Sequence, residues 1–157
     1  MWQEARQNFE QAAKLNPDSP GIDSDLGRVY TQTGDYDLAR SAFDRALARD
    51  PKEALPYLYL GELFEKQGDL RSAVGAYLNA GNLAPLWDKP PYRLSIIYGK
   101  LDRPCEGYYY RGRSFLLQDE DEKAVADFER AIKILGANSP RGQLIQDELK
   151  SLKARKR

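Results

Sequence analysis

Small and aromatic residues recur along the chain in sets that predict helices. Each set has an alanine, an aromatic residue four positions later and another alanine three positions after that, so the three side chains share one helical face. Small residues let a neighbouring helix approach closely, and the ring fills the remaining gap. The sets are Ala5-Phe9-Ala12, Ala39-Phe43-Ala46, Ala73-Tyr77-Ala80 and Ala124-Phe128-Ala131.

The first three sets follow one another at intervals of 34 residues, and each is followed by a proline, at Pro17, Pro51 and Pro85. Proline cannot continue a helix and biases the residue before it toward an extended conformation, so it ends each helix. The fourth set ends in Gly136 instead. A fixed period of this length indicates a repeat architecture, in which each unit packs only against its neighbours.

A matching first helix lies ahead of three of these helices. Each first helix contains a glycine, which removes a side chain where two helices cross closely. That gain must outweigh about 1 kcal/mol of lost helix propensity. The first helices contain Leu26-Gly27 with Tyr30, Leu60-Gly61 with Phe64, and Gly112 with Phe115.

The turns between the paired helices also repeat. Gly34 and Gly68 predict left-handed helix ends, and the aspartates that follow them, Asp35 and Asp69, are expected to cap the next helix. The last copy has Asp119 in place of the glycine.

These residues resemble the tetratricopeptide repeat family over nearly the whole chain. The resemblance implies an all-α fold, a right-handed superhelix of about nine helices in antiparallel pairs with a C-terminal capping helix. We expect a single array with these parts: a half repeat at 1–17, repeats at 20–53 and 54–87, an extra half repeat at 88–104, a repeat at 105–138 and the capping helix at 139–157.

The repeat spacing changes in the second half of the chain. Ala73 and Ala124 are 51 residues apart, one and a half periods, so one helix is missing or shared. We expect one first helix at 89–101 and another at 105–118, the latter serving both of its neighbours. Gly107 and Ser114 give this helix one small-residue face, and Gly112 gives it another.

Both ends depart from the repeat. The helix from Trp2 to Leu15 lacks the first helix that would normally cover it. Either Trp2 and Phe9 find cover elsewhere or this segment was cut from a longer array, which we favour.

At the C-terminal end, Ser139-Pro140 predicts an N-cap and a first-turn proline. The helix that follows is expected to pack through Leu144, Ile145, Leu149 and Leu152, with Asp147, Glu148 and Lys150 facing water.

Composition narrows the possible chemistry. The chain has 24 basic and 24 acidic residues, so no overall field steers it toward nucleic acid or an anionic membrane. It has no histidine, which excludes metal sites and catalytic triads that need an imidazole, and it has no glycine-rich phosphate loop. We expect a protein that is not an enzyme and needs neither cofactor nor metal. The only cysteine, Cys105, follows a proline at a helix start, where a thiol is acidified, but no second cysteine accompanies it.

In this family the first helices line a concave groove that binds an extended peptide or a partner helix. Tyrosine and arginine are enriched at binding hot spots. The residues that the resemblance places in the groove are Arg28, Tyr59, Glu62, Lys89, Tyr92, Arg93, Tyr109, Tyr110 and Arg113, with Ser24, Asp25, Leu58 and Ile96 beside them. Lys89 and Arg93 match positions that hold a partner's terminal carboxylate in chaperone-binding relatives. The other positions of that clamp hold Ser24, Arg28 and Tyr59 instead of lysine and asparagine, so we favour a solvated basic pair. Tyr108, Tyr109 and Tyr110 cannot all face one way, so at least one is expected to be exposed.

Three roles remain open. The first is a protein-interaction module that binds a peptide or partner protein, without inserting into a membrane or binding nucleic acid. The second is a regulatory or substrate-positioning appendage of a larger enzyme, because the segment from Tyr108 to Arg141 resembles arrays attached to bacterial zinc metallopeptidases. The third is self-association through the uncovered N-terminal helix. No apolar stretch is long enough to span a membrane, so we expect a soluble protein. The sequence leaves its compartment open between the cytoplasm and the periplasm, and the metallopeptidase resemblance would imply the periplasm.

Overall fold

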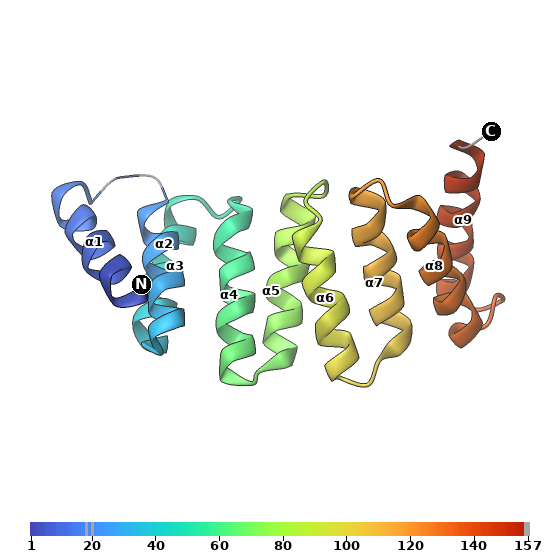
Figure 1. Ribbon diagram of the computed structural model, residues 1–157, viewed down its shortest axis with the longest axis horizontal. Coiled ribbons are helices and arrows are strands. Elements are labelled where there is room, and N and C mark those ends of the chain that lie inside the picture. The colour runs from blue at the N-terminus through green and yellow to red at the C-terminus, as the bar shows by residue number, and fades with distance from the viewer. Residues whose placement is uncertain (18, 20, 156–157) are drawn as a thin grey trace. The chain divides into compact units, whose positions relative to one another are not determined.

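The structure is a computed structural model that describes residues 1–17, 19 and 21–155. These residues form nine α-helices and no strand, which confirms the predicted all-α class (Figure 1). The predicted repeat start at residue 20 and the end of the capping helix at 156–157 lie outside the described residues. The helices are α1 (Trp2–Leu15), α2 (Ile22–Thr33), α3 (Tyr36–Arg49), α4 (Ala54–Gln67), α5 (Leu70–Leu83), α6 (Lys89–Lys100), α7 (Pro104–Leu117), α8 (Asp121–Leu135) and α9 (Pro140–Arg155).

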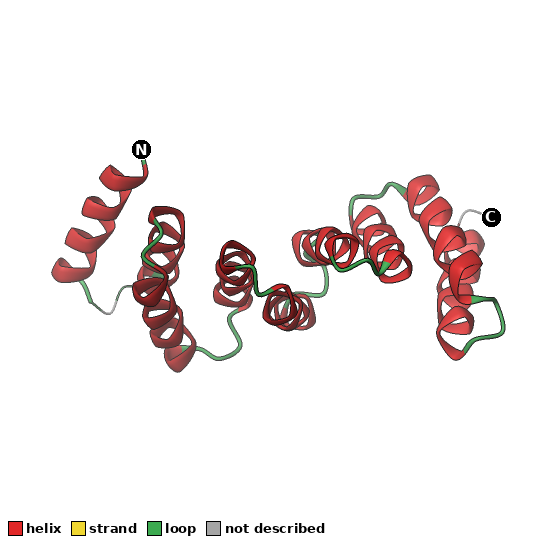
Figure 2. Cartoon of the chain, turned by 90° about the horizontal axis from the view of Figure 1, so that it is seen from below, coloured by secondary structure: helices red, strands yellow, loops and turns green. Residues whose placement is uncertain are grey.

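Contacts between helices divide the chain into two compact units, Met1–Ala84 and Pro85–Arg157. In the first unit α1 packs on α2, α2 on α3 and α4 on α5, and α4 also packs on both α2 and α3. In the second unit α6 packs on α7, α7 on α8 and α8 on α9. Figure 2 shows the loops that join successive helices within each unit. No helix in the described part of the chain combines the length and the apolar character needed to cross a membrane.

A glycine facing an aromatic ring sets the close crossing of three helix pairs. Phe43, Tyr77 and Phe128 are fully buried. Their rings lie directly over Gly27, Gly61 and Gly112, so a methyl group at Gly27 or Gly61 would overlap the ring, and one at Gly112 would lie 2.7 Å from Cε1 of Phe128. The prediction that these glycines allow close approach is confirmed.

Helix α7 packs on both of its neighbours through different faces, as the sequence predicts. At Gly107 an added Cβ would lie only 3.4 Å from the backbone oxygen of Ser95 on α6. On the same side, the hydroxyl of Ser114 donates to the carbonyl of Asp88 (3.3 Å), just before α6. Gly112 instead faces Phe128 and the backbone of α8. The shared helix therefore presents small residues on two faces, Gly107 and Ser114 toward α6 and Gly112 toward α8.

The turns adopt the predicted left-handed geometry. Gly34 and Gly68 have φ angles of 87° and 79°. Asp102 and Asp119 occupy the corresponding turn positions after α6 and α7, with φ angles of 54° and 58°. A left-handed conformation is strained for residues other than glycine, although aspartate tolerates it better than most.

Helix capping follows the prediction at two of three positions. Asp69 accepts a hydrogen bond from the backbone of Ser72 (3.0 Å), and the Ser139 hydroxyl accepts one from the backbone of Gly142 (3.0 Å). The predicted cap at Asp35 is wrong. Its carboxylate binds Arg6 (2.7 Å) and Thr33 (2.6 Å) instead, because α1 brings a cation within reach.

Helix α1 is only partly covered, and none of its residues is fully buried. Phe9 and Ala13 pack against a cluster of Ile22, Leu26 and Ala42 from α2 and α3. This contact gives Phe9 partial cover within the described chain, while Trp2 stays exposed.

Candidate protein-interaction surfaces

In the first unit the predicted groove residues Arg28 and Tyr59 lie together. The Arg28 guanidinium is 5.2 Å from the centre of the Tyr59 ring and 5.8 Å from that of the Trp2 ring. Burial raises the pKa of the Tyr59 hydroxyl, and burial also raises the pKa of the neighbouring Asp25 carboxyl, which the Arg28 charge partly offsets. Arg28 therefore ties α1, α2 and α4 together through cation–π contacts. Glu62 lies half-buried on the same helix as Tyr59.

In the second unit a cleft of about 950 Å³ lies between α7 and α9, with contributions from the loop before α6 and the turn between α7 and α8. Leucines form much of its lining. Two of them are unusually open to solvent, Leu86 at 85% and Leu144 at 68% exposure. The lining residues are Pro85, Leu86, Tyr109, Arg113, Leu116, Leu117, Asp119, Asp121, Leu144, Asp147, Glu148, Ser151 and Leu152. We call this the α7–α9 cleft.

A polar network crosses the α7–α9 cleft. Arg113 donates to the hydroxyl of Tyr109 (3.2 Å), which in turn donates to Oε1 of Glu148 (3.2 Å). The guanidinium of Arg113 also lies 3.7 Å from that oxygen. Burial raises the pKa of the Tyr109 hydroxyl, so it remains a donor at neutral pH. The second oxygen of Glu148 is buried and has no hydrogen-bond partner among the described residues.

The cleft is acidic. Asp119, Asp121, Asp147 and Glu148 line it, and among the described lining residues Arg113 is the one cation. Lys150 neutralises part of this charge through an ion pair with Asp147 (3.3 Å). Exposed leucines beside a carboxylate oxygen that lacks a donor suit an apolar ligand that carries a positive charge.

Two expectations for the capping helix α9 are corrected. Leu144 faces the cleft rather than the core, and Glu148 is half-buried and bonded to Tyr109 rather than facing water. Ile145 and Leu152 are buried as predicted. The helical spacing identified the apolar stripe, but it did not show that α7 leaves one edge of that stripe uncovered.

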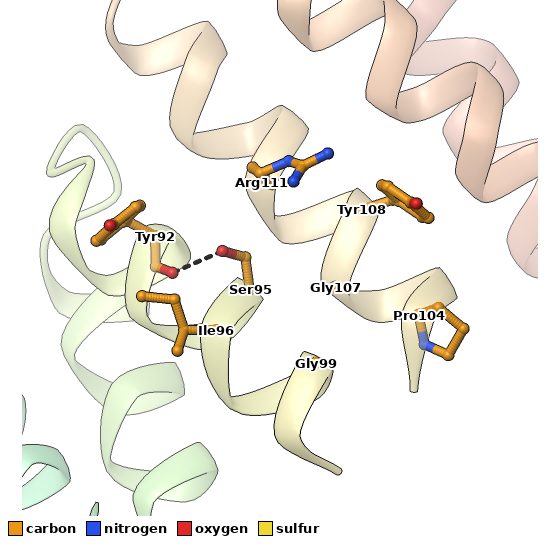
Figure 3. Close-up of a pocket in the computed structure, with 8 residues that line it drawn as sticks. All are labelled: Tyr92, Ser95, Ile96, Gly99, Pro104, Gly107, Tyr108 and Arg111. Atoms are coloured by element: carbon orange, nitrogen blue, oxygen red, sulfur yellow. Dashed lines mark hydrogen bonds between the residues drawn. The ribbon is translucent and has the colours of Figure 1, made fainter. Parts of the chain in front are cut away.

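A second hollow, of about 440 Å³, lies between α6 and α7, and we call it the α6–α7 groove (Figure 3). Figure 3 shows Tyr92 and Ile96 on the α6 side, with Tyr108 and Arg111 on the α7 side. The hydroxyl of Ser95 is turned back onto the carbonyl of Tyr92 (2.7 Å). The groove is lined by Tyr92, Ser95, Ile96, Gly99, Pro104, Gly107, Tyr108 and Arg111.

Arg111 lines the groove, and its guanidinium is bonded to α8. Its guanidinium donates two hydrogen bonds to Asp127 (2.5 and 2.8 Å), and these hydrogen bonds raise the pKa of Arg111. Asp127 is buried and also accepts from Arg130 (2.8 Å). Both guanidinium groups lie over the ring of Tyr108, at 5.2 and 5.7 Å.

The remaining predicted site residues of the second unit are dispersed. Tyr109 and Arg113 lie in the α7–α9 cleft, whereas Tyr92 lines the α6–α7 groove. Tyr110 stacks on Tyr98 of α6, with ring centres 5.4 Å apart. Lys89 is exposed and Arg93 is half-buried.

The three consecutive tyrosines point toward different neighbours, as predicted. Tyr108 packs beneath Arg111, Tyr109 contacts Phe128 of α8 and Tyr110 contacts α6. The expectation that one of them is exposed is wrong, because all three are half-buried. Because α7 has neighbours on two sides, more of its circumference is shielded from solvent than in a helix that packs in one pair.

Cys105 does not have the acidified thiol that its place at a helix start suggested. Burial raises the pKa of the Cys105 thiol, and the charge of Glu106 raises it further. The sulfur faces the carbonyl of Ala131 on α8 (3.9 Å). The residue therefore acts as part of the α7–α8 packing.

Comparison with known proteins adds to this picture. Two sequence models described as tetratricopeptide repeat match residues 1–60 and 106–134. Protein CTR9 homolog of Arabidopsis thaliana is 29% identical over 125 residues, which cover 80% of this chain and 10% of that protein. The chain thus spans about a tenth of the length of this curated relative.

Among solved structures, MamA 41-end from Desulfovibrio magneticus RS-1 is similar, with a TM-score of 0.66 and 21% identity, over 77% of this chain and 68% of that one. TTC0263, a thermophilic TPR protein from Thermus thermophilus, has a TM-score of 0.59 and 18% identity, over 96% of this chain and 90% of that one. At these identities the likeness concerns the fold.

Proposed function

The chain belongs to the tetratricopeptide repeat family, and from that premise we propose that it is a non-catalytic protein-interaction module whose α7–α9 cleft binds a short peptide segment of a partner protein. Function in such a scaffold resides in the site rather than in the fold, so the chemistry of the cleft specifies the ligand. That chemistry combines exposed leucines with an excess of carboxylates.

The preferred peptide carries apolar residues flanked by lysine or arginine. Leu86 and Leu144 offer an open apolar surface, and burying it against a ligand removes that surface from water. The carboxylates attract a cation and disfavour an acidic peptide. The unpartnered oxygen of Glu148 is the observation that carries the proposal, since a buried acceptor without a donor is costly and a ligand cation would supply one.

The experiment is a fluorescence-anisotropy titration with two labelled peptides of equal length, one alternating leucine with lysine and the other alternating leucine with glutamate. We expect only the basic peptide to bind. Leu144→Ser and Glu148→Gln should each weaken binding by about tenfold, equivalent to about 1.4 kcal/mol. Equal affinity for both peptides, or binding that is unchanged in both variants, would contradict the proposal.

Ile134→Ser provides a matched control for the leucine substitution. Ile134 is an exposed apolar residue on α8, 51% exposed, and lies outside the cleft lining. It should leave peptide affinity unchanged. A loss of binding in Ile134→Ser equal to that in Leu144→Ser would show that general surface hydrophobicity, rather than the cleft, attracts the peptide.

The other two roles expected from the sequence stay predictions. The exposed Trp2 on α1 is consistent with self-association. A chain that remains monomeric by light scattering at high concentration would count against that role. The resemblance to metallopeptidase-linked arrays stays a prediction as well.

A further inference from the structure

The α7–α9 cleft already contains a cation beside the carboxylate that the proposed ligand would use. Arg113 donates to the hydroxyl of Tyr109 (3.2 Å), and its guanidinium lies 3.7 Å from Oε1 of Glu148. A hydrogen-bonded contact between a guanidinium and a carboxylate spans about 2.7–2.9 Å, so this pair is loose. Arg113 therefore offsets the charge of Glu148 without satisfying it, and the second oxygen of the carboxylate has no donor among the described residues.

The repeat register explains why Arg113 is held loosely. The second and fourth alanine–aromatic–alanine sets are 85 residues apart, and the same interval relates Arg28 to Arg113 and Tyr59 to Leu144. In the first unit the guanidinium of Arg28 lies over the Tyr59 ring, 5.2 Å from its centre. Leu144 has no ring, so Arg113 cannot make the equivalent cation–π contact and turns to the polar groups of the cleft instead.

The same register accounts for the carboxylate. Glu148 is the counterpart of Leu63, which is 1% exposed on α4. Helix α4 packs against α2 in the first unit, whereas in the second unit a cleft lies between α7 and α9. A carboxylate at a position that is otherwise apolar and buried loses hydration, so it needs a cation from the cleft or from a ligand. In the free protein Arg113 supplies that cation.

We propose that Arg113 is a built-in competitor of the ligand, which occupies Glu148 in the free protein and withdraws when a lysine or arginine of the ligand binds this carboxylate. The inference rests on the proposed function of the α7–α9 cleft and adds a regulation of that site. Two positive charges beside one carboxylate repel each other, so the ligand cation binds at the expense of the Arg113–Glu148 contact. The side chain of Arg113 is 40% exposed, so it can turn to water without leaving a buried, unpaired charge.

A competitor and a positioning residue have opposite effects when they are removed. If Arg113 held Glu148 in place for the ligand, its loss would weaken binding. The hydroxyl of Tyr109 also donates to Oε1 of Glu148 (3.2 Å), and this hydrogen bond does not need Arg113. The carboxylate therefore keeps its place in Arg113→Gln, and the sign of the change in affinity distinguishes the two roles.

The experiment repeats the fluorescence-anisotropy titration with the labelled leucine–lysine peptide on variants of the full chain. Arg113→Gln should bind this peptide about tenfold more tightly than the unaltered chain, because the competing charge is gone. Arg113→Lys keeps the charge and should stay within about threefold of the unaltered chain. Unchanged or weaker binding in Arg113→Gln would overturn the competitor role. Circular dichroism checks that both variants stay helical.

Lys153→Gln is the matched control for the loss of one positive charge. Lys153 lies on α9 outside the cleft lining, and its ion pair with Glu129 (3.0 Å) is exposed. The substitution should leave peptide affinity within about twofold of that of the unaltered chain. A gain equal to that of Arg113→Gln would mean that net charge, rather than the contact with Glu148, limits binding, and the proposal would be wrong.

A double-mutant cycle tests whether Arg113 acts through Glu148. Glu148→Gln removes the charge for which Arg113 and the ligand compete. Adding Arg113→Gln to this variant should therefore change peptide affinity by less than about twofold. A tenfold gain in the Glu148→Gln background would show that Arg113 opposes the ligand at another place, which contradicts the proposal.

The proposed function and this inference fail separately. If neither the unaltered chain nor Arg113→Gln binds the leucine–lysine peptide, the proposed function of the cleft is wrong, and this inference is wrong as well. If the unaltered chain binds the peptide and Arg113→Gln binds it no better, the cleft remains a peptide site and Arg113 is not its competitor.

Discussion

Gly61 shows how one missing side chain determines a helix crossing. The ring of Tyr77 fills the space where its Cβ would be, and the hydroxyl of Tyr77 is fixed by a hydrogen bond to Glu65 (2.6 Å). The ring therefore cannot move aside easily. Alanine at this position gains about 1 kcal/mol in helix propensity but overpacks a buried contact, which costs about 1–3 kcal/mol.

We expect Gly61→Ala to lower the free energy of unfolding by up to about 2 kcal/mol, measured by urea denaturation. Gly75→Ala is the control. It changes the same residue type in the next helix, where an added Cβ meets nothing within 4 Å, and it should raise stability by up to about 1 kcal/mol. If both variants were stabilised, the close crossing would not depend on a bare backbone at Gly61.

Some residue-level features could be predicted and others could not. Gly27, Gly61 and Gly112 were identified because a small residue and a distant ring recur at fixed spacing. The ion pair of Arg111 with Asp127 was not identified, because nothing in the local pattern connects two charges on different helices. Extending the 34-residue register to Arg111 does indicate that a ring is missing there, and this signal points to the α6–α7 groove.

At the scale of helices, the turns show how far the repeat tolerates substitution. Gly34, Gly68 and Asp102 follow one another at 34-residue intervals, and all three are left-handed. Asp102 is exposed, so its side chain adds little packing to offset the strain of this conformation. A left-handed residue other than glycine costs about 1–2 kcal/mol, and glycine loses about 0.5–1 kcal/mol more backbone entropy on folding.

Asp102→Gly should therefore raise the free energy of unfolding by about 0.5–1 kcal/mol, visible as a higher midpoint of thermal denaturation. The reverse change, Gly34→Asp, should lower it by a similar amount, because φ at Gly34 is 87°. No effect in either variant would mean that the turns relax without strain.

The sequence predicts the helices well, but it does not predict which residues share a binding surface. The two small-residue faces of α7 follow from Gly107, Ser114 and Gly112, and the structure places them against α6 and α8. The resemblance predicts one continuous groove for these residues. In the structure α7 packs on two sides, so Tyr109 and Arg113 lie in the α7–α9 cleft, whereas Tyr92 lies in the α6–α7 groove with Arg111. The direction in which the side chains of a shared helix point depends on both of its neighbours. Residue spacing within one repeat does not contain this information.

For the whole molecule, a net charge of zero conceals local charge. The α7–α9 cleft is lined by four carboxylates, whereas α6 has three cations and no acidic residue. At physiological ionic strength charges are screened beyond about 8 Å, so the carboxylates of the cleft set the local sign that a ligand meets there. A net charge of zero argues against long-range steering, but composition could not show the local acidic charge of the cleft.

The contacts of this chain are between neighbours, so damage to one helix pair should remain local. Phe43 and Phe128 occupy the same repeat position in different compact units, and both are fully buried. Replacing either with alanine should cost about 3–5 kcal/mol of local stability. In hydrogen exchange followed by mass spectrometry, Phe43→Ala should lose protection mainly in α2, α3 and α4, and Phe128→Ala mainly in α7, α8 and α9. Equal loss across all helices in both variants would instead indicate that the two units unfold together as one cooperative block.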